Sequence, residues 1–209
     1  MRDVAVFLYD RTGVMAQPWA EAGYTCYCVD IQHKIRRERV EGNIHFVWGD
    51  VRTWAPPLAV RRRLAFGFAF PVCTHVCVSG ARDFLTKGTA LLRDSLEMFS
   101  AAEHAFKWAG VPYGIENSVG KFSDHMGKPD YTFQPWHYGD PWTKLTCVWA
   151  GNGFVMPPRE FQEMPEGTEQ KIWLMPPSDE RADLRSATPP GFARAVFQSN
   201  HAALLRAAA

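Results

Sequence analysis

Two residues in this sequence could together do nucleophilic chemistry, the cysteine Cys73 and the glutamate Glu116. Each follows an apolar run typical of a buried strand, 64–70 for the cysteine and 111–115 for the glutamate. A thiol beside a carboxylic acid is what nucleophilic addition to carbon 6 of a pyrimidine requires. If both strands are parallel members of one sheet, the two side chains face the same crevice, where open α/β sheets place their ligands.

The elements that must position these residues can be predicted from the hydrophobic pattern. Strands are expected over 4–9, 24–29, 44–48, 64–70, 111–115 and 143–149, the last one antiparallel at the far end of the sheet. Helical spacing of apolar residues predicts helices over 15–22, 89–109 and 191–205. The alternation of strands and helices predicts an α/β fold with a doubly wound, mostly parallel sheet.

The first strand–turn–helix–strand unit has the layout of a nucleoside-binding half-fold. A turn with one glycine, Gly13, follows the first strand, and Asp30 closes the second. An acid at this position can accept hydrogen bonds from both ribose hydroxyls, and the glycine lets a ligand approach the backbone.

Composition limits the classes of protein to consider. The chain has 209 residues, 46% of them hydrophobic, and a net charge of +1, which suits one α/β domain over 1–209 without a global basic field. The basic runs 34–39 and 61–63 are either solvated faces or nucleic-acid contacts. The proline-rich stretch 151–190 is expected to be an irregular insertion, with one short strand over 170–174.

The sequence favours a cytoplasmic protein that does not enter the membrane. No apolar stretch approaches the roughly 20 residues that a membrane span needs, and the first residues lack the pattern of a signal peptide. Five cysteines without disulfide spacing indicate a reducing compartment. Cys73 and Cys77 have no second Cys/His pair at ligand spacing, so we expect no metal site.

With these pieces in order, the sequence resembles DNA cytosine-5 methyltransferases, particularly the small forms that phages and prophages encode. The matching segments run in the family's order: 9–13, 30–31, 49–51, 71–73 followed by 79–81, 115–117 and 191–197. The block 134–144 also looks like a signature of the phage-type relatives. The resemblance implies a Rossmann-like class I fold with S-adenosylmethionine as cofactor, acting in the host cytoplasm if the chain is phage-encoded.

The resemblance also assigns expected roles to individual residues. Cys73 and Glu116 are the expected catalytic pair. The expected cofactor contacts are Tyr9, Asp10, Thr12, Gly13, Asp30, Ile31, Asp50, Val51 and Pro71. The expected substrate contacts are His75, Ser79, Arg82, Asn117 and Lys144.

The implied reaction is addition of a methyl group to carbon 5 of cytosine in DNA. Cys73 attacks carbon 6 while Glu116 donates a proton or hydrogen bond at ring nitrogen 3. The thiol needs a depressed pKa for this, and His75 and Arg82 are candidates for the cation that lowers it. A cytosine in duplex DNA must also be flipped out of the base stack to reach the site.

The sequence departs from the family pattern at several points. Val72 stands where the family has proline, Arg11 where the first glycine of the turn would be, and Lys144 in place of the family's arginine. Only about 45 residues separate the Lys144 strand from the last helix, too few for a separate target-recognition lobe. A protein partner could supply that recognition.

Two alternatives therefore stay open. The same chemistry could act on a pyrimidine nucleotide or on single-stranded nucleic acid, or the chain could be a non-catalytic relative that binds a nucleotide or a partner. Trp136, Tyr138 and Trp142 form either a wall for a base or part of the core, and His137 is either structural or positions the substrate.

Overall fold

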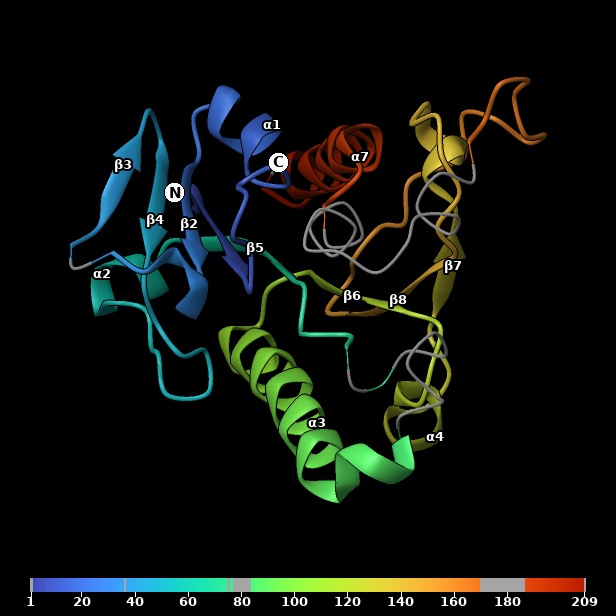
Figure 1. Ribbon diagram of the computed structural model, residues 1–209. Helices are drawn as coiled ribbons and strands as arrows, with labels where there is room; N and C mark the ends of the chain where they lie inside the picture. The colour runs from blue at the N-terminus through green and yellow to red at the C-terminus, as the bar shows by residue number, and fades with distance from the viewer. Residues whose placement is uncertain (1, 36, 75, 77–83, 170–186, 209) are drawn as a thin grey trace.

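An eight-stranded sheet with helices packed against it forms the body of the protein (Figure 1). The computed structural model describes residues 2–35, 37–74, 76, 84–169 and 187–208. The strands are β1 (Val4–Leu8), β2 (Thr25–Val29), β3 (Arg39–Glu41), β4 (Ile44–Val47), β5 (Leu64–Ala69), β6 (Tyr113–Ser118), β7 (Tyr131–Phe133) and β8 (Thr146–Gly151). The α-helices are α1 (Gln17–Glu21), α2 (Leu58–Arg61), α3 (Phe84–Ala109), α4 (Phe122–Met126) and α7 (Pro190–Ala208), with 3-10 turns η1 (Ile31–His33) and η3 (Pro135–Tyr138).

The strand order is β3-β4-β2-β1-β5-β6-β8-β7. The five strands from β4 to β6 are parallel to one another. Antiparallel β3 flanks them at one edge, and antiparallel β8 flanks them on the other side, where the edge strand β7 pairs antiparallel with β8. Every residue of β1 and β5 is buried, as expected for central strands that are covered on both faces. The expectation of an α/β fold with a mostly parallel sheet is confirmed.

The sheet separates two hydrophobic cores. In β1, Phe7 contributes to the core that contains Trp19 of α1 and Phe192 of α7, whereas Val6 contributes to the core that contains Phe99 of α3. Successive strand residues point to opposite faces, so one apolar run supplies both cores. Figure 1 shows the result, with α1 and α7 on one side of the sheet and α3 on the other.

The predicted strand 111–115 was placed too early, and this changes the setting of Glu116. β6 runs from Tyr113 to Ser118, so Glu116 and Asn117 lie within the strand and not after its end. Pairing with β5 stops at Ile115, but antiparallel β8 continues to pair with β6 as far as Ser118. The second neighbour therefore extends the strand beyond its apolar run.

Other differences from the predicted elements are smaller. β8 lies between β6 and β7, so the prediction that this strand ends the sheet was wrong, and the short strands β3 and β7 were not predicted. Both are only three residues long, which is too short for a periodic signal. The helix expected over 15–22 is shorter, and α3 begins five residues before the expected start at 89. The strand expected over 170–174 lies outside the described residues.

The last helix is fixed to the block 134–144 by its N-terminus. The backbone N–H groups of Gly191 and Phe192 donate to the carboxylate of Asp140, at 3.0 Å and 3.4 Å. A Cβ at Gly191 would lie 1.9 Å from the carbonyl oxygen of Tyr138, so only glycine permits this approach. The contact brings the residues just before α7 to the carboxyl edge of the sheet.

No helix in the described ranges is long and apolar enough to cross a membrane. Residues 152–169 form turns and loops that return to the 134–144 block, where the Thr143 N–H donates to the Glu169 carbonyl at 3.1 Å. The extent of the expected insertion, 151–190, and the single-domain assignment stay predictions.

Candidate active site

A cavity of about 300 Å³ lies at the carboxyl ends of the parallel strands. Loops after β1, β2, β4 and β5 contribute to its wall, together with β6. The expected site residues that line it are Tyr9, Asp10, Thr12, Asp30, Ile31, Asp50, Val51, Pro71, Cys73, Glu116 and Lys144. Residues from distant parts of the sequence thus converge where the topology predicts a ligand.

The turn after β1 is held by Asp10. Its Oδ1 accepts hydrogen bonds from the backbone N–H groups of Thr12 and Gly13, at 2.9 Å and 2.8 Å, and from the Thr12 hydroxyl. Burial raises the pKa of this carboxyl group, and the hydrogen bonds from the turn oppose that shift. Asp10 therefore shapes the cavity floor mainly by fixing the backbone.

Gly13 belongs to the turn and does not line the cavity. Its φ is +73°, and a Cβ would lie 2.9 Å from the Phe46 ring. The sequence argument expected Gly13 to contact a cofactor; the structure instead gives it the left-handed backbone that ends the turn.

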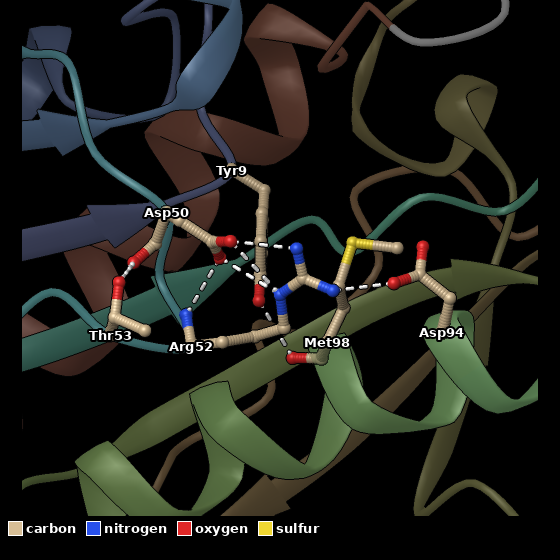
Figure 2. Close-up of polar contacts among 6 residues, drawn as sticks. All are labelled: Tyr9, Asp50, Arg52, Thr53, Asp94 and Met98. Atoms are coloured by element: carbon tan, nitrogen blue, oxygen red, sulfur yellow. Dashed lines mark hydrogen bonds and ion pairs between the residues drawn. The ribbon is translucent and has the colours of Figure 1, made fainter.

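Tyr9 occupies an unusual backbone conformation at the end of β1. Its φ is +58°, which is rare for a bulky residue and costs free energy that contacts around it must offset. The Tyr9 hydroxyl donates to the Met98 carbonyl oxygen of α3 at 3.0 Å (Figure 2). Burial is the main cause that raises the pKa of the phenol. The side chain thus joins the turn after β1 to α3 across the cavity wall.

Asp30 is a buried acid at the end of β2, with 4% of its surface exposed. Its Oδ1 caps η1 by accepting the Gln32 N–H at 2.6 Å, and Oδ2 accepts no hydrogen bond from the described residues. Burial raises the pKa of Asp30, an effect that Gln32, His33 and Arg11 partly offset. Next to it, Ile31 is 51% exposed and offers an apolar surface to the cavity.

Asp50, at the end of β4, is paired with Arg52. Figure 2 shows the Arg52 guanidinium between Asp50 and Asp94 of α3. Hydrogen bonds from Arg52 lower the pKa of Asp50. Asp50 was expected to contact a ligand, but in the structure its carboxylate is already bonded to Arg52.

The loop after β5 brings Cys73 to the cavity, where its side chain is half-buried. Asn117 fixes this loop from behind, because its Nδ2 donates to the Pro71 carbonyl at 2.7 Å. The Lys121 N–H also donates to the Val76 carbonyl at 2.7 Å, which joins the loop to the segment after β6. Asn117 is buried and does not line the cavity, so its expected substrate contact is replaced by a positioning role.

Glu116 and Lys144 form an ion pair inside the cavity. The Lys144 Nζ lies 3.2 Å from Glu116 Oε1, and both side chains are less than a fifth exposed. Gln134 positions the lysine, because its Oε1 accepts the Lys144 N–H at 2.8 Å. The arrangement puts a carboxyl group, a cation and a thiol around one space.

Some residues of the cavity were not foreseen. Met98 of α3 and Thr188, two residues before α7, both line it, as does Arg52. Met98 lies within an ordinary amphipathic helix, so the sequence held no signal for it. Thr188 lies just before the segment 191–197, and the resemblance of that segment to a family motif could have drawn attention to it.

His75, Ser79 and Arg82 lie outside the described residues, so their expected substrate contacts and the proposed cation stay predictions. The aromatic residues of the 134–144 block do not line the cavity described above. Tyr138 is buried against Phe133 and Phe192, and its hydroxyl donates to the Pro157 carbonyl at 3.0 Å. His137 accepts the Gln134 N–H through Nδ1, which makes it part of a structural turn.

Within the described ranges, no group of three or more His, Cys, Asp or Glu side chains is arranged to hold a metal ion. A scan against protein-family models and a search of curated proteins found no match to this chain. The functional argument therefore rests on the geometry of the site.

Proposed function

We propose that this protein is an S-adenosylmethionine-dependent methyltransferase that adds a methyl group to carbon 5 of cytosine in DNA. One observation carries the proposal: Cys73, Glu116 and Lys144 line the same cavity as the buried acid Asp30. A covalent nucleophile, an acid and a nucleoside-binding carboxylate are the parts that this reaction needs.

The sheet topology supports the finer fold assignment. Five parallel strands in the order β4-β2-β1-β5-β6, followed by an antiparallel strand placed before the edge strand β7, match the arrangement of Rossmann-like class I methyltransferases. In such sheets the cofactor lies at the carboxyl ends of the first strands, where the turn after β1 and Asp30 are found.

The residues present fit a nucleoside-containing cofactor. Asp30 keeps an acceptor oxygen for ribose hydroxyls, and the exposed face of Ile31 suits an adenine ring. A volume of about 300 Å³ is at the small end of the roughly 300–1,000 Å³ that ligand pockets span. When bound, S-adenosylmethionine supplies the electrophilic methyl group.

Cys73 and Glu116 then share the work on the pyrimidine. The thiolate of Cys73 forms a bond to carbon 6, while Glu116 in its protonated form donates the Oε2 proton to ring nitrogen 3, so that electron density moves to carbon 5. Lys144, bonded to Oε1, compensates the charge of the carboxylate that this donation leaves. Carbon 5 takes the methyl group, with S-adenosylhomocysteine as the leaving group. A base then removes the carbon 5 proton, the sulfur–carbon bond breaks with return of the thiolate, the ring double bond is restored, and nitrogen 3 returns its proton to Glu116.

Binding and transfer test the proposal in sequence. Isothermal titration with S-adenosylhomocysteine should show binding that Asp30→Ala weakens. Transfer of a tritiated methyl group to DNA should then depend on Cys73, with Cys73→Ala inactive. Cys26→Ala is the matched control, because Cys26 is buried in the core away from the cavity. Absence of cofactor binding at millimolar concentration would overturn the proposal.

A pyrimidine nucleotide is the second candidate substrate, and the contacts of the basic run 61–63 favour it over DNA. Arg61 stacks on Trp108 and Arg63 pairs with Asp3, so two of the three cations have intramolecular partners. Because these contacts give the run a structural role, it is less available to bind DNA phosphates. Comparing methyl transfer to duplex DNA, a single-stranded oligonucleotide and deoxycytidine monophosphate separates the two substrates.

A further inference from the structure

Arg52 contacts both oxygens of the Asp50 carboxylate. Its single Nε–H is shared between the two oxygens, at 2.9 Å and 3.1 Å, and its Nη2 donates to Oδ2 at 2.6 Å. The backbone N–H of the same residue donates to Oδ1 at 3.0 Å. A carboxylate oxygen has two lone pairs, and each oxygen of Asp50 already accepts two of these contacts from Arg52.

The Arg52 side chain also bonds to Asp94 of α3, so it bridges two carboxylates. Arg52 Nη1 donates to Asp94 Oδ1 of α3 at 2.5 Å, so the guanidinium joins the loop after β4 to the helix (Figure 2). Arg52 lines the cavity described above and also a second one of about 310 Å³, whose wall includes Trp54 and His104. The guanidinium therefore has space on more than one side if it leaves Asp50, and Asp94 still compensates its charge.

We propose that Arg52 is a specificity-determining residue that competes with the amino group of a bound adenine for Asp50. This inference rests on the proposed function, since it takes the ligand to be an adenosine-containing cofactor. Asp50 follows β4, the neighbour of β2, and lines the cavity together with Asp30 and Ile31, so it is the acid that this neighbouring strand presents to an adenine lying on Ile31. An exocyclic amino group is a hydrogen-bond donor and needs a carboxylate oxygen with an available lone pair. In the structure Asp50 offers one only after Arg52 releases it.

The ion pair between Arg52 and Asp50 is weak enough for a bound ligand to displace it. The side chains of Arg52, Asp50 and Asp94 are 36%, 28% and 42% exposed, so water screens the bridge. Ion pairs with this exposure contribute modestly, and removing the competing side chain should tighten ligand binding by about two- to fivefold. The same screening predicts that added salt tightens binding to the wild-type protein more than to Arg52→Ala.

Two ligands and two variants test the competition. S-adenosylhomocysteine carries the amino group, whereas S-inosylhomocysteine has a carbonyl oxygen in its place. Arg52→Ala removes the guanidinium but keeps the backbone N–H on Asp50. Arg63→Ala is the matched control, because it breaks a similarly exposed two-bond pair with Asp3 that does not line the cavity.

Titration calorimetry should show that Arg52→Ala binds S-adenosylhomocysteine about two- to fivefold more tightly than wild type, with no such gain for S-inosylhomocysteine. Arg63→Ala should match the wild type with both ligands. Weaker or unchanged binding of S-adenosylhomocysteine by Arg52→Ala would overturn this inference alone. Absence of binding by the wild-type protein would overturn the proposed function and this inference with it.

Discussion

Replacing Asn117 with alanine should separate the positioning of Cys73 from the stability of the fold. Asn117 is 1% exposed, and its amide joins β6 to the loop after β5 through a 2.7 Å bond to the Pro71 carbonyl. Its Oδ1 also accepts the Ser118 N–H at 3.0 Å. The alanine variant removes both bonds from a place that water does not reach.

The expected magnitude follows from those bonds. A hydrogen bond contributes about 0.5–1.5 kcal/mol net, and a buried polar group left without a partner costs about 1–3 kcal/mol. We therefore expect Asn117→Ala to lower the free energy of unfolding by roughly 2–3 kcal/mol. A domain of ordinary stability, about 5–15 kcal/mol, would remain folded.

Asn200 supplies the control. It is also 1% exposed, and its amide makes three hydrogen bonds, to Val155 and Val196, within and beside α7. Urea unfolding followed by tryptophan fluorescence should show a comparable loss for Asn200→Ala. Methyl transfer, measured where both variants are folded, should fall more than tenfold only for Asn117→Ala. Equal activities of the two variants, or a stability loss below about 0.5 kcal/mol for Asn117→Ala, would refute the reasoning.

Three further predictions concern Asp30, Asp140 and Lys144. Burial raises the pKa of Asp30, so the folded state binds more protons than the unfolded one and stability falls as pH rises through that window. Asp30→Asn should therefore be more stable than wild type at pH 7, should lose that advantage as the pH falls through the raised pKa, and should bind the cofactor more weakly, as urea titrations at several pH values and calorimetry can show. Asp140→Ala should lose about 1–3 kcal/mol in urea unfolding because the N-terminus of α7 loses its cap, and Asp140→Asn should lose less because it keeps an acceptor oxygen. Lys144→Met should destabilise the fold by roughly 1–3 kcal/mol, because Glu116 is left without its partner, and should reduce methyl transfer more than tenfold, because the carboxylate that Glu116 forms on donating its proton loses its cation. Lys121→Met, which breaks an exposed pair with Asp124, should change the unfolding free energy by less than about 1 kcal/mol.

The central strands β1 and β5 were predictable because each carries a continuous apolar run. Val4–Leu8 and Leu64–Ala69 are buried on both faces, and burial on both faces requires the uninterrupted apolar composition that both strands have. The acids and the cysteine that follow such runs were predictable for the same reason, since the residue after a parallel strand faces the ligand edge. The short edge strand Tyr131–Phe133 forms because it pairs with β8, and no local sequence pattern predicts that pairing.

The contacts that finish the site depend on residues far apart in sequence. Arg52 meets Asp94 across 42 positions, and Asn117 meets Pro71 across 46. A local pattern could identify Asp50 as a strand-end acid, but not that Arg52 occupies it. Likewise, the spacing of residues could nominate Lys144 as a substitute for an arginine, whereas its contact with Glu116 follows from the packing of β8 against β6.

Trapping the covalent adduct of Cys73 would test the central claim most directly. A cytosine with fluorine at carbon 5 has no proton there to lose, so after methylation the sulfur–carbon bond cannot be broken by the normal elimination. Incubating the protein with S-adenosylmethionine and DNA containing 5-fluorocytosine should give a stable protein–DNA product. Peptide mass spectrometry should locate it on Cys73, and Cys73→Ala should form none. A protein that binds the cofactor but leaves Cys73 unmodified, with every substrate offered in the fluorinated form, would contradict the account.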